Sequence, residues 1–112
     1  MAARPPRLFH RWKCPWCAAA RQGIGNTGAA VELVEVPYDR DERHEVLAAS
    51  GQARVPVLVD GDRVIVGSQR IVRHMYATYG DGPGSRSVHE LDLEIAALDA
   101  EGLGGYEGPA PA

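Results

Sequence analysis

The sequence predicts a single α/β domain, and three features of the chain carry that prediction. Short apolar strand candidates alternate with segments of helical periodicity over residues 7–80. The only two cysteines stand three positions apart, directly after the first strand candidate. A Val55-Pro56 pair opens a third strand, which leads into a hairpin turn at residues 60–62. With 112 residues, the chain is long enough to bury one modest core.

The composition excludes several classes of protein. The chain is 45% hydrophobic and 24% charged, which is typical of a globular protein. Two cysteines so close in sequence cannot cross-link distant parts of a fold, and they are too few for a four-cysteine zinc site. No apolar run is long enough for a membrane span, and the first residues lack a signal-peptide core. A net charge of −3 disfavours nucleic acid as a partner. We therefore expect a cytoplasmic protein with no membrane or nucleic-acid partner.

The first half of the chain predicts two strands and two helices. Pro15 suits the first turn of a helix. Asp39 or Asp41 can cap a second helix, with Val46 and Leu47 facing inward. The expected elements are a strand over 7–10, a helix over 15–27, a strand over 31–36 and a helix over 40–50.

The second half predicts a hairpin and two further helices. Residues 57–59 and 64–66 are its strands, and Ser68 is expected to cap a helix that ends at Gly80. The Met75, Tyr76 and Tyr79 stripe of that helix is expected in the core. A linker over 81–86 leads to an amphipathic helix over about 88–101, and the Gly- and Pro-rich end predicts a frayed tail over 102–112. The order is βαβαββα plus a C-terminal helix, with residues 1–80 as the core and 81–112 as an extension of the same domain.

Cys14 and Cys17 are the strongest candidates for chemistry. At a helix start, unpaired backbone N–H groups and the helix dipole stabilise the thiolate of the first cysteine, the form that attacks disulfides. Cys17 lies deeper in the helix and is expected to remain a thiol at neutral pH. Trp16 lies between them and is expected to face a substrate, with a place in the core as the alternative. Two inert buried thiols, or half of a metal site, are the alternatives for the pair. No histidine is assigned to catalysis or to a metal.

Positive charge is concentrated near these cysteines. Residues 1–31 carry five cations and no acid, whereas the remaining 81 carry seven cations and fifteen acids. Arg11 and Lys13 flank Cys14, so we expect a local field that favours its thiolate and attracts an anionic thiol. The alternative is that these cations are solvated surface.

The strand–CPWC–helix pattern resembles the glutaredoxin branch of the thioredoxin fold. The Val55-Pro56 pair matches that family, and Arg11 is the basic residue that the family has three positions before its first cysteine. Residues 55–76, with Gly67-Ser68 inside them, resemble the N-terminal domain of a glutathione S-transferase. The resemblance covers residues 7–80. It implies a central mixed four-stranded sheet flanked by helices.

The resemblance also implies a glutathione site around the cysteines. Pro56 is expected in the cis form, which lets the Val55 backbone pair with a peptide-like ligand. Gly67 and Ser68 are expected to bind the γ-glutamyl carboxylate at a helix N-terminus, and Arg11 the glycyl carboxylate. An ordinary trans proline, a Ser68 that only caps its helix and a solvated Arg11 are the alternatives.

The predicted function is a glutaredoxin-like thiol–disulfide oxidoreductase. Cys14 attacks a protein disulfide or a glutathione mixed disulfide, and Cys17 or a small thiol resolves the product. Glutathione or an equivalent thiol supplies the electrons, with no bound cofactor and no metal. The partners are that thiol and disulfide-containing client proteins, and the chain is expected to be a monomer. Two alternatives come from other classes: a glutathione-binding module of transferase type, and a carrier of a glutathione-bridged [2Fe–2S] cluster.

Overall fold

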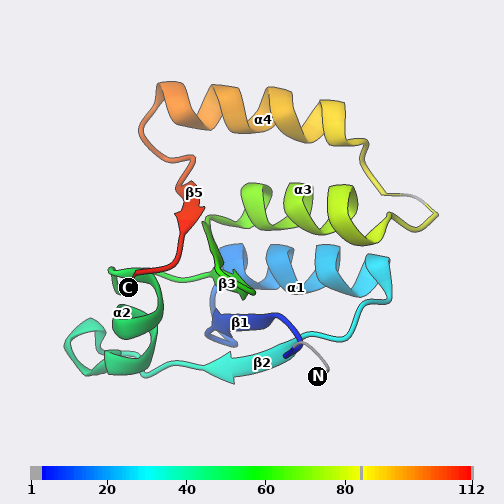
Figure 1. Ribbon diagram of the computed structural model, residues 1–112. Coiled ribbons are helices and arrows are strands. Elements are labelled where there is room, and N and C mark those ends of the chain that lie inside the picture. The colour runs from blue at the N-terminus through cyan, green and yellow to red at the C-terminus, as the bar shows by residue number, and fades with distance from the viewer. Residues whose placement is uncertain (1–3, 84, 112) are drawn as a thin grey trace.

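The protein folds as a mixed five-stranded sheet with helices on both faces, as a computed structural model of residues 4–83 and 85–111 shows (Figure 1). The sheet order is β2-β1-β3-β4-β5; β1 and β2 are parallel and the other neighbours antiparallel. The strands are β1 (Arg7–His10), β2 (Glu32–Glu35), β3 (Val57–Asp60), β4 (Arg63–Val66) and β5 (Tyr106–Pro109). The helices are α1 (Pro15–Thr27), the 3₁₀-helix η1 (Arg40–Glu42), α2 (His44–Ser50), α3 (Ser68–Tyr79) and α4 (Val88–Ala100).

The three central strands bury both of their faces. Successive side chains of a strand point to opposite faces, so β1, β3 and β4 contribute to two separate cores. One core packs against α1 and α3, which lie side by side (Figure 1); its buried members are Leu8, Ala20, Ile24, Leu58, Ile65, Ile71 and Met75. The other includes Val46 of α2, with Phe9, Val36, Val57, Val59, Val64 and Val66. This two-sided burial fixes the ends of the strands, where the candidate site lies.

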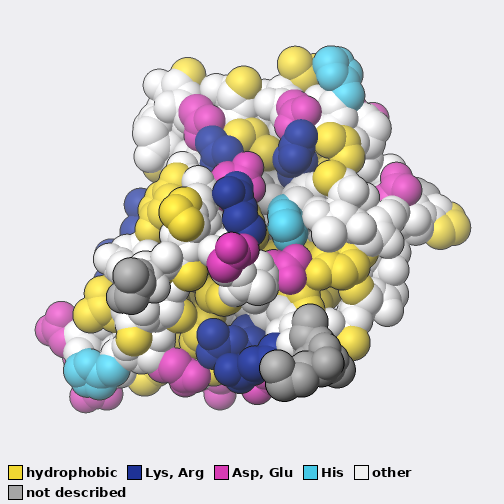
Figure 2. Space-filling model, viewed as in Figure 1, with side chains coloured by type: hydrophobic (Ala, Val, Ile, Leu, Met, Phe, Trp, Pro, Cys, Tyr) yellow, Lys and Arg dark blue, Asp and Glu magenta, His cyan; other side chains and the backbone are white. Residues whose placement is uncertain are grey.

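Helix α4 packs on α3 rather than on the sheet. Leu91 is fully buried against Val72 and Tyr76 of α3, whereas Leu93 is exposed. Arg70–Asp99 and Arg73–Asp92 ion pairs join the two helices, and Figure 2 shows the cations and acids gathered between them. Among the described residues, no helix has the length and apolar character needed to span a bilayer.

The C-terminal segment differs from the prediction, because it forms β5 rather than a frayed tail. It pairs antiparallel with β4, from Val66 opposite Tyr106 to Arg63 opposite Pro109. A proline is tolerated there because β5 is an edge strand, where one missing N–H costs no ladder partner. The sheet therefore has a fifth strand beyond the four predicted.

The helix predicted over 40–50 is broken into η1 and α2. The break lies at Arg43, a buried residue whose guanidinium binds backbone carbonyls rather than pointing to solvent. As predicted, Asp39 caps the segment, and its Oδ1 accepts the Asp41 N–H at 3.0 Å. Val46 is buried as expected, but Leu47 is half exposed, so its inward placement was wrong.

Two details of α3 also differ from the prediction. Gly67, with φ of 108°, precedes the helix, and the Ser68 side chain makes no capping bond; its Oγ instead donates to Gln69 Oε1 at 2.7 Å. Met75 and Tyr76 are buried, but Tyr79 is exposed and its hydroxyl donates to Asp60 Oδ2. The glycine supplies the left-handed turn into the helix, which leaves the serine inside its first turn.

Candidate active site

Cys14 lies at the N-terminus of α1 and caps it with its own sulfur. Its backbone is extended, with φ of −126° and ψ of 116°, and its Sγ accepts the backbone N–H of Cys17 at 3.3 Å. Pro15 follows at the first helical position, which has no intrahelical partner for an N–H. The Cys14 side chain is partly exposed. The Cys14 sulfur therefore lies at the positive end of the helix dipole and accepts a backbone N–H of the first turn.

Cys17 lies behind Cys14 and is fully buried. Burial raises the pKa of Cys17 to about 12, and its hydrogen bond with the Cys14 side chain adds to this. The Arg11 backbone N–H and the charge of Arg21 act in the opposite direction. The structure therefore presents one accessible sulfur and one inner thiol that is protonated at neutral pH, as the sequence predicted.

The segment before Cys14 is held by Arg21 of α1. The Arg21 guanidinium donates to the Arg11 carbonyl at 3.1 Å and to the Trp12 carbonyl at 3.4 Å, and it stacks 4.7 Å from the Trp12 ring centre. It also lies 3.0 Å from Nδ1 of the buried His10. Burial, followed by the Arg21 charge, lowers the pKa of His10, with Glu35 opposing. A neutral His10 can accept this bond.

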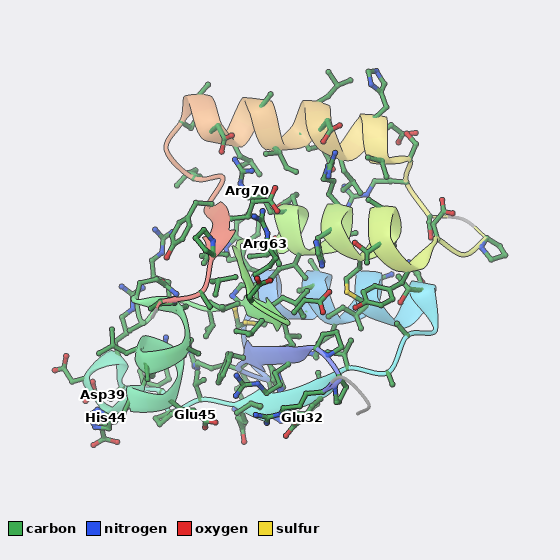
Figure 3. The ribbon with its side chains drawn as sticks, in the orientation of Figure 1. Glu32, Asp39, His44, Glu45, Arg63 and Arg70 are labelled. Carbon is green, nitrogen blue, oxygen red and sulfur yellow. The ribbon has the colours of Figure 1, made fainter. Side chains whose placement is uncertain are left out.

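The Val55–Pro56 bond is cis, as the sequence predicted. Arg43 braces the approach to it: the guanidinium donates to the carbonyls of Pro37, Tyr38 and Ala53 at 2.7–2.9 Å. The bend that carries Val55 is thus fastened to the loop after β2. Asp39, which marks that corner in Figure 3, caps the 3₁₀ turn beside it.

A polar groove of about 760 Å³ opens beside Cys14. Four of its residues are arginines and two are aspartates, so its wall is net positive. Arg11 stacks on the Tyr38 ring, with 4.2 Å from its guanidinium carbon to the ring centre. The lining residues are Arg11, Cys14, Trp16, Tyr38, Asp39, Arg40, Asp41, Arg43, Arg54 and Val55.

A smaller cavity of about 120 Å³ adjoins this groove at the start of α3. We call it the α3 cavity. Its lining residues are Trp16, Arg54, Val55, Pro56, Val66, Gly67, Ser68, Gln69, Leu103 and Gly105.

The residues singled out in the sequence converge on these two spaces. Arg11 and Cys14 line the groove, Trp16 and Val55 line both, and Pro56, Gly67 and Ser68 line the α3 cavity. Cys17 lies buried behind them, and Lys13 lines neither.

Sequence reasoning missed several lining residues. Arg54 lines both spaces, and its place directly before the Val-Pro pair is a signal that could have found it. Leu103 and Gly105 reach the α3 cavity from the C-terminal segment, and no motif marks them. Arg70 fastens that segment through the Gly104 carbonyl at 2.9 Å and through Asp99 at 2.6 Å (Figure 3).

The sequence of this chain matches a known protein family. Residues 8–84 match the glutathione S-transferase N-terminal domain family. The chain belongs to that family. The match runs through both halves of the predicted resemblance, the CPWC segment included. No curated protein sequence gives a significant match to this chain.

Several solved structures share the fold. Glutathione S-transferase unclassified 2 from Bombyx mori superposes with a TM-score of 0.68 at 17% identity, over 87% of this chain and 48% of its own. Glutaredoxin 2 from Salmonella typhimurium, in complex with glutathione, superposes with a TM-score of 0.60 at 24% identity, over 88% of this chain and 45% of its own. A glutathione transferase homologue from Burkholderia, with bound glutathione, superposes with a TM-score of 0.59 at 18% identity, over 85% of this chain and 53% of its own. The chain thus spans about half the length of these proteins, and its predicted thioredoxin-like fold is confirmed.

Proposed function

We propose that this domain is a glutathione-dependent thiol–disulfide oxidoreductase of glutaredoxin type. One observation carries the proposal: the Cys14 sulfur caps α1 at the rim of an arginine-lined groove, with the Cys17 thiol buried directly behind it. A lone accessible sulfur can form a mixed disulfide, and a second thiol within the same turn can resolve it. Neither arrangement is needed by a domain that only binds glutathione.

The reaction we propose has two thiol–disulfide exchanges. The Cys14 thiolate attacks the glutathione sulfur of a client mixed disulfide, and the client leaves as a thiolate that takes a proton from water. A second glutathione thiolate then attacks that same glutathione sulfur, which releases Cys14 and forms oxidised glutathione. Alternatively, Cys17 attacks Cys14, which releases glutathione and leaves a Cys14–Cys17 disulfide for two external thiols to reduce.

Glutathione is the small thiol that the site suits. Two of the similar structures contain glutathione. The ligand would lie along Val55, with its γ-glutamyl group in the α3 cavity beside Gly67 and Ser68. Its glycyl carboxylate would meet Arg11 and Arg54 in the positive groove, where charge-assisted bonds are strongest. Client proteins would bind over the exposed Trp16. We also propose a monomer that works in the reducing cytoplasm, where such thiols stay reduced.

Turnover of a glutathione mixed disulfide tests the proposal. The assay contains the protein, glutathione, NADPH and glutathione reductase, and follows NADPH consumption. We expect turnover by the wild type, none above background by Cys14→Ser, and retained turnover by Cys17→Ser through the glutathione route. Equal rates for wild type and Cys14→Ser would refute the proposal.

A glutathione transferase module is the second candidate, because the family match and several similar structures are transferases. Such a module would conjugate glutathione to an electrophile without using Cys14 as a nucleophile. An aryl halide conjugation assay separates the two functions. Conjugation that persists in Cys14→Ser, with no disulfide reduction by wild type, would favour the transferase.

A further inference from the structure

Arg21 contacts every residue of the segment 10–12, which leads into the two cysteines. One guanidinium makes three contacts with three consecutive residues: Nη1 with the His10 ring nitrogen at 3.0 Å and the Arg11 carbonyl at 3.1 Å, and Nη2 with the Trp12 carbonyl at 3.4 Å. His10 is almost fully buried, and its ring meets the Trp12 ring edge-on at 4.6 Å. A planar guanidinium with several fixed donors can hold a loop in one conformation in a way that an ammonium cannot.

The held segment faces the inner cysteine. The Arg11 backbone N–H and the Arg21 charge both act to lower the pKa of Cys17. Arg21 itself lies one helical turn beyond Cys17 on α1. Both effects favour negative charge on Cys17, against the burial that opposes it.

We propose that Arg21 is a positioning residue for the resolving step: it holds the Arg11 N–H against the Cys17 sulfur and supplies the charge that lets Cys17 attack the mixed disulfide on Cys14. The inference rests on the proposed function and assigns one of its two routes. In that step Cys17 loses its proton to water and its sulfur bonds to Cys14 Sγ. The Cys14–glutathione bond breaks, and glutathione leaves as a thiolate that takes up a proton. The mixed disulfide itself is the oxidant.

Other charged groups face Cys17 and must be held constant in a test. Cys14 lies on the same helix turn, and its charge opposes ionisation of Cys17. Arg43, from the segment between η1 and α2, interacts electrostatically with both sulfurs. The Arg43 guanidinium binds carbonyls outside the 10–12 segment, so replacing Arg21 leaves both Cys14 and Arg43 in place.

The test measures release of glutathione from Cys14, starting from protein loaded with one glutathionyl group. Wild type is compared with Arg21→Met, Arg21→Lys and the distant control Arg73→Met, across a pH series and without added thiol. We expect release to rise with pH in wild type and to fall several-fold in Arg21→Met, because this variant loses both the hold on the Arg11 backbone and the Arg21 charge. Arg21→Lys keeps the positive charge but loses the planar guanidinium with its several donors, so its rate of glutathione release should lie between those of wild type and Arg21→Met. Arg73→Met should match wild type.

A second rate separates positioning from mere folding. Alkylation of Cys14 by iodoacetamide is measured in the Cys17→Ser background, with and without Arg21→Met. This rate should change less than about threefold, because the α1 N-terminus is unaltered. Equal glutathione release in wild type and Arg21→Met would overturn the inference, as would an equal fall in both rates. If wild type never accepts a glutathionyl group on Cys14, the proposed function fails instead.

Discussion

The segments around the cysteines and helix α4 are held in place by different means. Around the cysteines, two arginines fasten backbone carbonyls: Arg21 holds Arg11 and Trp12, and Arg43 holds the loop after β2. Helix α4 instead packs on α3 through the buried Leu91 and its apolar neighbours. The ion pairs that join the two helices, Arg70–Asp99 and Arg73–Asp92, are partly exposed side-chain pairs rather than bonds to the backbone. Guanidinium bonds to carbonyls set direction and distance, whereas apolar burial contributes free energy with little direction. Changes in the first region should therefore alter chemistry, and changes in the second should alter stability.

The largest effect is expected from Leu91→Ala. Leu91 is fully buried between α4 and α3, so its truncation should lower the free energy of unfolding by about 2–5 kcal/mol. The matched control is Leu93→Ala, which removes an exposed leucine of the same helix and should cost under about 0.5 kcal/mol. Urea unfolding measures both. Slower Cys14 alkylation in a folded Leu91→Ala protein would break the contrast between the two regions.

Gly105→Ala should have the next largest effect on stability. Gly105 has φ of 73°, and an added Cβ would collide with the Val66 carbonyl of β4. We expect a loss of about 2–3 kcal/mol from backbone strain and a disturbed β4–β5 pairing. Gly102→Ala is the control: its φ of 75° is equally unfavourable, but the space around it is open, so about 1 kcal/mol is expected. Equal losses in both variants would mean that the close approach of β5 contributes nothing.

Arg54→Gln should weaken binding of glutathione without affecting stability. Arg54 is exposed and lines both the polar groove and the α3 cavity, so we expect an affinity loss of roughly two- to fivefold that shrinks as salt is raised. Arg63→Gln, which removes an exposed cation on β4 outside both spaces, should leave affinity unchanged. Titration calorimetry at two salt concentrations measures the difference. Identical affinities for the two variants would remove Arg54 from the site.

The smallest effect concerns pH. The pKa of His10 in the folded protein lies below its ordinary value of 6.5, so the folded state binds fewer protons there than the unfolded state. The stability that the neutral His10 contributes to the folded state is therefore complete above pH 6.5, and it is lost as the pH falls from 6.5 through the folded-state pKa. His10→Gln should therefore lose less stability than wild type between neutral pH and about pH 5. Parallel losses in both proteins would show that protonation of His10 does not oppose the Arg21 contacts.

The sequence predicted what is encoded by neighbouring residues. A cysteine followed by proline at a helix start, a Val-Pro pair before a hairpin and the Asp60-Gly61 turn each depend on a few adjacent positions, and all three features are present. The amphipathic helix expected over about 88–101 is also present as α4, with Leu91 and Ile95 buried one helical turn apart. These local signals are enough to place Cys14 and Cys17 at a helix start and Pro56 at the entry to the hairpin.

What the sequence could not predict depends on contacts between distant segments. The last strand has a glycine- and proline-rich sequence that is typical of a tail, and it is ordered by pairing with β4. Arg43 resembles a solvated helix residue, yet its guanidinium reaches carbonyls 5 to 10 positions away. Ser68 matched a capping pattern, but Gly67 takes the turn that a cap requires. In the first two cases tertiary contacts outweighed a local preference, whereas at Ser68 the neighbouring glycine took the cap position.

The central claim is that Cys14 alone forms the covalent intermediate with glutathione. Cys17→Ser, which cannot resolve such an intermediate internally, should be incubated with oxidised glutathione and examined by intact and peptide mass spectrometry. The account predicts one glutathionyl group, located on Cys14, and its removal by added glutathione. A protein that remains unmodified under conditions in which its Cys14 is readily alkylated would contradict the account.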